Sequence, residues 1–157
     1  MAERFTHIEN GRARMVDISA KHEVARRALA EGTIRLRKET IEAIREGIIE
    51  KGNVLAVARV ASIQAVKRTW DTLPMCHQIP ITGIDIGFDI GDTAITVRVE
   101  VSSVARTGVE MEALYGASIA LLTIWDMVKS AEKDGSGNYP FNEIYGLKVI
   151  AKEKGSV

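Results

Sequence analysis

The sequence of 157 residues has one cysteine, three prolines and few aromatic residues, and its 21 basic residues balance 21 acidic ones. A single cysteine excludes an internal disulfide and any zinc site built on two or more thiolates, which agrees with a reducing compartment. The zero net charge leaves no long-range field that would attract DNA, RNA or an anionic membrane. Any anionic ligand must therefore be held by local groups.

Long apolar runs are also missing. No run reaches the roughly 18 residues that a membrane span needs, and the first 15 residues, MAERFTHIENGRARM, lack the apolar middle of a signal peptide. We therefore expect a cytoplasmic protein that contacts neither membrane nor nucleic acid. The apolar fraction of 46% supports a core, and we expect a flexible arm at 1–14 followed by a single domain at 15–157.

Periodicity predicts the first half of the fold. We expect a short extended piece at 15–19 and then a strand at 28–37, where small or apolar residues alternate with longer ones. A short helix should follow at 38–47, stopped by Gly47. Asn53 is a suitable N-cap for a second helix that reaches about Trp70.

The second half shows a hairpin, a long helix and a last strand. Residues 84–90 and 94–101 both alternate around a Gly-Asp turn, which predicts the hairpin. Thr107 and Glu110 form a capping box that opens a helix over 108–133, and a final alternation around 147–151 predicts a strand. The expected fold class is α+β, a ferredoxin-like β-α-β-β-α-β arrangement in which helices cover one face of an antiparallel sheet.

Both long helices are apolar on nearly every side. A helix of this kind must be buried on every side, and one domain with a single sheet does not provide enough cover for two of them. We therefore expect an oligomer. Glu112, Asp126 and Lys129 would then lie near a subunit contact, where burial shifts pKa values.

The Cys76-His77 pair lies between Pro74 and Pro80. A metal site is disfavoured because no C-x-x-C or H-x-x-x-H spacing accompanies the pair, so we expect no metal. A thiol nucleophile would need a base and an electropositive setting that the sequence does not show. The remaining alternative is a buried thiol and a hydrogen-bonded histidine in a stiff loop, and these alternatives stay open on the residues alone.

Two other groups of charged residues allow both a structural and a functional interpretation. The spacing of Asp126 and Lys129 is that of an exposed helical ion pair, but a desolvated lysine beside a carboxylate is a typical general acid or base. Glu110 and Glu112 bracket Met111 in the first turn of a helix, where free backbone N–H groups can donate hydrogen bonds to a ligand.

Four blocks of sequence resemble a known family. They are RMVDISAK (14–21), KGNVLAVARVASIQAVKRTWDTLPMCHQIP (51–80), TGVEMEALYGAS (107–118) and TIWDMVKSAEKD (123–134). In this order they resemble the molybdenum cofactor biosynthesis protein C family, the cyclic pyranopterin monophosphate synthases.

The resemblance implies an enzyme that converts 3',8-cyclo-7,8-dihydroguanosine 5'-triphosphate into cyclic pyranopterin monophosphate and diphosphate. It also implies a ferredoxin-like catalytic domain and a homohexamer, built as a trimer of dimers, with the sites at dimer contacts. We expect no cofactor. The alternative is a non-catalytic nucleotide-binding or assembly module, because ferredoxin-like folds often serve in that way.

The resemblance also implies the site residues. Asp126, Lys129 and Lys51 match the catalytic positions, with Lys129 expected to have a depressed pKa. The positions matched to substrate binding are Met75, Cys76, His77, Met111, Glu112, Glu110, Arg26 and Asp17. Met75 departs from a usual leucine and Asn53 from an aspartate. The tail KVIAKEKGSV also departs from the family ending, which leaves the roles of Lys152 and Lys154 undecided.

Overall fold

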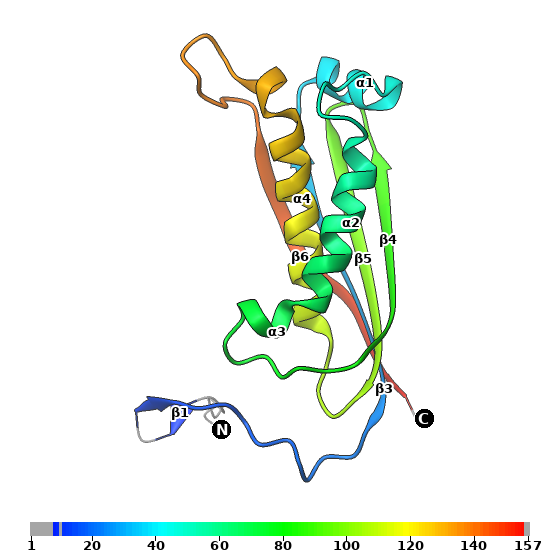
Figure 1. The fold of residues 1–157 in the computed structure, drawn as a ribbon, viewed down its shortest axis with the longest axis vertical. Coiled ribbons are helices and arrows are strands. Elements are labelled where there is room, and N and C mark those ends of the chain that lie inside the picture. The colour runs from blue at the N-terminus through cyan, green and yellow to red at the C-terminus, as the bar shows by residue number, and fades with distance from the viewer. Residues whose placement is uncertain (1–7, 10, 156–157) are drawn as a thin grey trace.

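A computed structural model describes residues 8–9 and 11–155 (Figure 1). The elements in chain order are β1 (Ile8–Glu9), β2 (Arg12–Ala13), β3 (Val24–Arg35), α1 (Lys38–Glu46), α2 (Val54–Lys67), α3 (Thr69–Thr72), β4 (Ile81–Ile90), β5 (Ala94–Ala105), α4 (Glu110–Glu132) and β6 (Glu143–Gly155).

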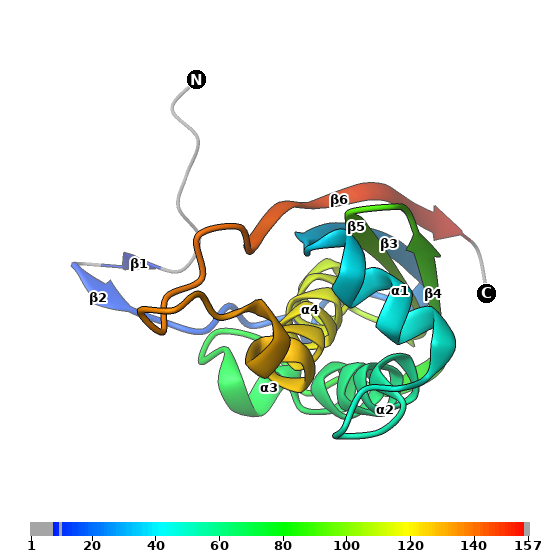
Figure 2. The same cartoon turned by 90° about the horizontal axis from the view of Figure 1, so that it is seen from above.

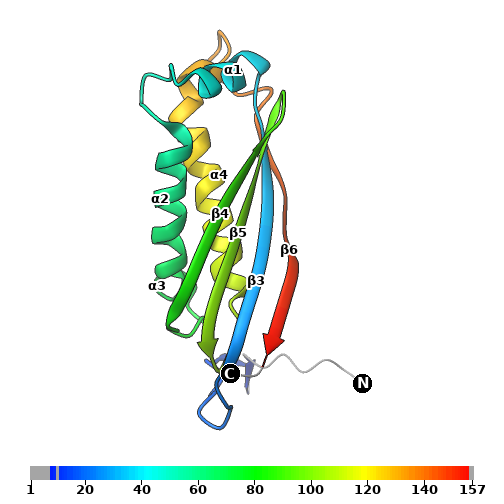
Figure 3. The ribbon, with the colours of Figure 1, turned by 90° about the vertical axis from the view of Figure 1, so that its right-hand side faces the viewer.

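The four long strands form one sheet in the order β4-β5-β3-β6, and each neighbouring pair is antiparallel. Helices α2 and α4 cover one face of this sheet (Figures 2 and 3). The predicted α+β class is confirmed, and the order of elements is consistent with the ferredoxin-like arrangement that the sequence predicted.

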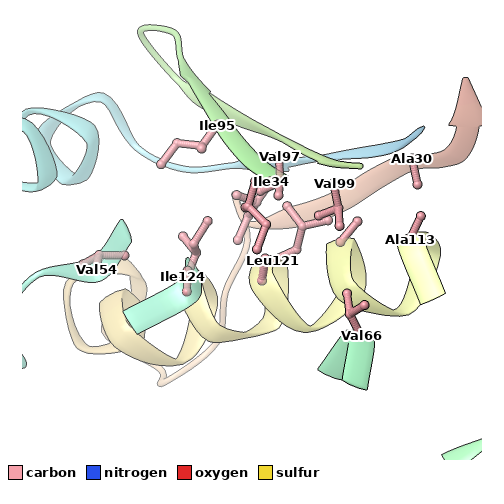
Figure 4. Packing of buried hydrophobic residues seen from close by; sticks show 14 of the residues in the cluster. Ala30, Ile34, Val54, Val66, Ile95, Val97, Val99, Ala113, Leu121 and Ile124 are labelled. Atoms are coloured by element: carbon pink, nitrogen blue, oxygen red, sulfur yellow. The ribbon is translucent and has the colours of Figure 1, made fainter. Parts of the chain in front are cut away.

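The core lies between the sheet and α4. Buried side chains of β3 and β5 meet those of α4, and Figure 4 shows Ile34, Val97 and Val99 facing Leu121 and Ile124. Strand alternation explains the set, because every second residue of β5 from Ile95 to Val101 points to this face. Gly32 allows close packing here, since a Cβ at this position would lie 2.7 Å from Leu121 Cδ1 and the leucine side chain would have to shift.

A second face of α4 packs on α2. A Cβ at Gly116 would lie 2.6 Å from Val66 Cγ2 and 3.2 Å from Ser62 Oγ, so glycine allows the two helices to approach closely. Part of the apolar surface that the sequence argument reserved for another subunit is therefore covered within the chain. Val60 and Leu122 remain 56% and 55% exposed.

Several predicted boundaries differ from the structure. Strand β3 begins at Val24, not at residue 28, and ends before residue 37. Residues 15–19, expected as an extended piece, form no strand. Strand β6 covers 13 residues, and the sequence predicted only its middle. Most of this edge strand is exposed, including the apolar Tyr145, Leu147 and Ile150, so the strand has no clear alternation of apolar and polar residues.

The predicted capping box at the start of α4 is wrong. Val109 is the N-cap residue, and its side chain makes no capping hydrogen bond. The Glu110 carboxylate instead lies beside Gly108, where any larger side chain would overlap it. A short hairpin also forms between β1 and β2, inside the region expected as an arm. Residues 1–7 and 10 lie outside the described residues, so the division at 14 stays a prediction.

By length and composition, α4 is one helix that is long and apolar enough to cross a membrane. Half of its apolar window is buried inside the fold, and a core helix passes the same test. The absence of a membrane contact stays a prediction.

Candidate active site

A cavity of about 710 Å³ lies at the N-terminal end of α4. The loop from Pro74 to His77 forms one wall, and the first turn of α4 forms another. The cavity contains the predicted residues Met75, Cys76, His77, Glu110, Met111 and Glu112. Other lining residues that the sequence did not single out are Val16, Ile18, Lys21, Leu73 and Gly108, and Thr107 was named only as a cap. All six lie within the sequence blocks that resemble the family, and this was the signal available for finding them.

His77 connects two walls of the cavity. Its Nε2 lies 2.7 Å from the carbonyl oxygen of Val16 and donates to it, so the loop holds the segment that precedes β3. Asp17 does not line the cavity. Its Oδ1 accepts from the Ser19 N–H at 2.8 Å, and this backbone hydrogen bond is the main reason that the pKa of Asp17 is lowered.

Two groups in the cavity have raised pKa values. Glu112 is only 4% exposed, and burial, followed by repulsion from Glu110, raises the pKa of its carboxyl. Burial also raises the pKa of the Cys76 thiol, and the neighbouring charge of Glu112 adds to this shift. A thiol with a raised pKa is a poor nucleophile, which argues against thiolate chemistry at Cys76.

A smaller hollow of about 180 Å³ adjoins the cavity and shares Gly108 and Glu110 with it. Arg26, Lys152 and Lys154 line this hollow. Lys152 Nζ lies 3.0 Å from Glu110 Oε1. Burial acts to raise the pKa of Glu110, but its own backbone N–H and Lys152 together lower it. The buried Nε of Arg26 has no hydrogen-bond partner among the described residues.

The three predicted catalytic residues meet near the C-terminal end of α4. Lys51 Nζ donates to the carbonyl oxygen of Asp126 at 2.8 Å and to its Oδ2 at 3.1 Å. Lys129 Nζ donates to Asp126 Oδ1 at 2.7 Å. Asp126 therefore bridges two lysines, and its side chain is 59% exposed.

The pKa of Lys129 in this charged cluster differs from the one that the sequence led us to expect. Hydrogen bonds from Lys129 and then Lys51 lower the pKa of Asp126. The hydrogen bond to Asp126 raises the pKa of Lys129, whereas the sequence analysis expected a depressed value. In this chain the lysine is not desolvated, and its carboxylate partner stabilises the charged form.

The structure therefore brings the predicted residues into two groups, not one. Glu110 and Asp126 lie on the same helix, and at 1.5 Å per residue about 24 Å of helix axis separates them. Six predicted binding residues line the cavity at the start of α4, and the predicted catalytic residues lie near its end. Figure 1 shows α4 running along the long axis of the fold. Among the described residues, no group of three or more His, Cys, Asp or Glu side chains is placed to hold a metal ion.

The fold and the two clusters define an α+β protein with a ligand cavity and a separate charged cluster. The MoaC family matches the chain over residues 15–155. A protein of Methanosarcina mazei named "Probable cyclic pyranopterin monophosphate synthase" is 63% identical over 99% of both chains. A protein of Pyrococcus furiosus with the same name is 54% identical over 96% of this chain and 97% of its own length. The chain belongs to the MoaC family.

One relative has a different name. A protein of Methanothermobacter thermautotrophicus is 57% identical over 97% of this chain and 96% of its own length. It is named "Probable cyclic pyranopterin monophosphate synthase accessory protein".

Proposed function

We propose that this chain is a cyclic pyranopterin monophosphate synthase of molybdenum cofactor biosynthesis, a lyase. It converts 3',8-cyclo-7,8-dihydroguanosine 5'-triphosphate into cyclic pyranopterin monophosphate and diphosphate, and it acts in the cytoplasm without a bound cofactor. The observation that carries the proposal is the likeness over almost the whole length to relatives named for this reaction. Both clusters of the structure supply residue types that the chemistry needs.

The charged cluster supplies the proton transfers. Opening the five-membered ring of guanine and building a pterin requires protons to be added to nitrogen and removed from oxygen. Asp126 holds Lys51 and Lys129 within hydrogen-bond distance of its carboxylate. When substrate and a covering surface exclude water, desolvation acts against the charged form of a lysine, which favours proton donation.

The cavity supplies binding. Met75 and Met111 give it apolar surface. Burial raises the pKa of Glu112, which favours the neutral acid that could donate a proton to a ring atom. Arg26, Lys152 and Lys154 in the adjoining hollow provide positive charge for the phosphates. Attack of a sugar hydroxyl on the α-phosphate forms the cyclic phosphate and expels diphosphate, and positive charge stabilises that leaving group.

The active site requires a second copy of the chain. About 24 Å of helix axis separates the two clusters within one chain, so no single small molecule contacts both ends of α4 in the same subunit. Exposed Val60 and Leu122 offer apolar surface for a contact between copies. We propose a homohexamer built as a trimer of dimers, in which the cavity of one chain faces the charged cluster of its partner.

The test is incubation of the purified protein with the cyclised guanosine triphosphate, followed by product detection and a diphosphate assay. We expect product and diphosphate in equal amounts. Substrate that binds without turnover would disprove the proposed reaction.

The name of the Methanothermobacter relative favours a second candidate, an accessory module that binds the nucleotide or assembles with an enzyme. Such a module would bind substrate through the cavity residues and would not depend on Lys129. Isothermal titration with substrate, set beside the turnover assay, distinguishes the two candidates.

A further inference from the structure

Glu132, in the last turn of α4, is a wholly buried carboxylate, with 0% of its surface exposed. Its Oε1 accepts from the backbone N–H of Arg37 at 3.0 Å. Its Oε2 is buried and has no hydrogen-bond partner among the described residues. Burying a carboxyl group with one partner is costly, so its position calls for a physical explanation that core packing does not give.

The hydrogen bond of Glu132 holds the start of the segment that carries Lys51. Arg37 is the N-cap residue of α1, and Gly47 is its C-cap residue. A turn then follows, in which the Gly52 N–H donates to the Ile49 carbonyl oxygen at 2.9 Å. This turn places Lys51 over Asp126. The segment from Arg37 to Lys51 is thus tied to α4 by polar contacts at both of its ends.

Apolar contacts of α1 are few in number. Ile41 is wholly buried, Ile44 packs partly buried against the core, and Leu36, two residues before the helix, is wholly buried. An isolated helix of 9 residues is marginal in water. Arg45 fixes the far end of α1 by donating to the carbonyl oxygens of Ile90 and Gly91, both at 3.0 Å. The position of α1 therefore depends on these hydrogen bonds as well as on the buried Leu36 and Ile41, and Glu132 makes the hydrogen bond that connects the start of α1 to the helix of Asp126 and Lys129.

A carboxylate also suits the N-terminal end of α1. The first N–H groups of a helix carry partial positive charge, and a negative group near them is favourable. The N-cap residue Arg37 has an extended backbone and makes no side-chain capping bond, so Glu132 supplies from another helix what a local cap would supply.

We propose that Glu132 is a positioning residue for Lys51: by fixing the start of α1 it holds Lys51 in contact with Asp126. The consequence for turnover rests on the proposed function, whereas the consequence for structure does not. A misplacement of about 1 Å in a catalytic group can cost on the order of a hundredfold in rate.

Two substitutions break the hydrogen bond from opposite sides. Glu132→Met has similar length and no acceptor. Arg37→Pro removes the N–H, and proline tolerates the backbone of Arg37, whose φ is −64°. Glu132→Gln keeps an acceptor oxygen and is the conservative variant. Ile86→Val, a buried change on β4, is the control for a general loss of stability.

The first measurement is hydrogen exchange of the purified protein. We expect Glu132→Met and Arg37→Pro to speed exchange in residues 37–53 and to leave the β5 and α4 amides protected. Glu132→Gln and Ile86→Val should match the wild type in 37–53. Unchanged exchange in both disrupting variants would overturn the proposal, and so would equal loosening in Glu132→Gln.

The second measurement is the carboxyl titration of Asp126 by NMR. Because Lys51 helps to lower the pKa of Asp126, its displacement should move that pKa upward in Glu132→Met and not in Glu132→Gln. A purely structural role would leave the titration unchanged and would contradict the proposal.

Turnover is the third measurement. We expect both disrupting variants to lose about tenfold or more in kcat, with a smaller change in KM. The double variant should be no worse than either single one, because both remove the same bond. Additive losses would overturn the proposal. A wild-type protein without turnover would disprove the proposed function alone, since exchange and titration still test the positioning role.

Discussion

The two ends of α4 provide opposite environments from one continuous helix. At its start Glu112 is buried in a cavity and the pKa of its carboxyl is raised. Near its end Asp126 is exposed between two lysines, and the pKa of its carboxyl is lowered. The same functional group is therefore biased toward the neutral acid at one end and toward the charged base at the other.

The difference comes from what covers each end. The Cys76-His77 loop and the segment bound through Val16 close over the start of α4. Asp126 is contacted by Lys51 from the turn after α1 and by Lys129 from its own helix, and its side chain stays 59% exposed. In the proposed function the start of α4 binds substrate and its end exchanges protons, so a complete active site needs both environments.

The largest expected effect tests the charged end. Lys51→Ala and Lys129→Ala should each fold and assemble but lose about 10² to 10⁴ in kcat, the usual contribution of general acid–base catalysis. Product and diphosphate assays measure the loss. Lys133→Ala, an exposed lysine beyond the end of the same helix, is the matched control and should keep wild-type turnover. Near-normal rates in either variant would remove that lysine from the mechanism.

An element of the fold could be predicted from the sequence where a local rule, such as N-capping or strand alternation, determines it. Asn53 accepts from the Ala56 N–H at 3.0 Å, as expected for an N-cap, and the hairpin of β4 and β5 follows from strict alternation. The capping box failed because Thr107 lies too far upstream once the helix begins at Glu110. The length of β6 was underestimated because backbone pairing with β3, not a regular alternation of apolar residues, defines this strand.

The site was predictable as a set of residues but less so as a geometry. Spacing along a helix implies the separation of Glu110 from Asp126. The contact of His77 with Val16 joins residues 61 apart in sequence, and the periodicity of a sequence does not predict such a long-range contact. The exposure of Asp126 depends on which neighbours cover the helix end, and this is a tertiary property that residue types alone do not determine.

Mixing two inactive variants tests whether the two ends act between copies. Glu112→Ala disables the cavity end and Lys129→Ala disables the charged end. If each site combines one end from each chain, a mixed dimer contains one site with no substitution. Random exchange at equal amounts should then restore about a quarter of wild-type activity, as two-fold symmetry requires.

Subunit exchange after mild denaturation and renaturation, followed by the turnover assay, measures this recovery. Each variant treated alone is the control and should stay inactive. No recovery in mixed dimers, verified by mass spectrometry, would show that the two ends do not combine between chains.

A smaller effect separates the two residues of the cavity loop. Cys76→Ser should keep turnover within about threefold, because burial keeps the thiol protonated and its role is packing. His77→Gln should lose about tenfold, because the amide can replace only part of the hydrogen bonding of the imidazole. Steady-state kinetics measures both. A folded but inactive Cys76→Ser would instead support a thiolate nucleophile.

The smallest expected effect is on the pH dependence of the free energy of unfolding, and it has opposite signs at the two ends. The folded pKa of Glu112 is raised above its ordinary value of 4.5, so its favourable contribution is present below that pH and is lost as pH rises through the folded pKa. Glu112→Gln should therefore be more stable than the wild type at neutral pH, by about 1 kcal/mol, the scale of one uncompensated buried polar group, and equal to it in acid.

Asp126→Asn gives the opposite sign. The folded pKa of Asp126 is lowered from 3.8, so its contribution is present above that value and is lost as pH falls through the folded pKa. The variant should be slightly less stable than the wild type at neutral pH, since exposed ion pairs contribute little, and equal to it in strong acid. Urea unfolding at a series of pH values measures both differences at constant protein concentration. Two differences of the same sign at neutral pH would mean that the ends of α4 do not provide opposite environments for a carboxylate.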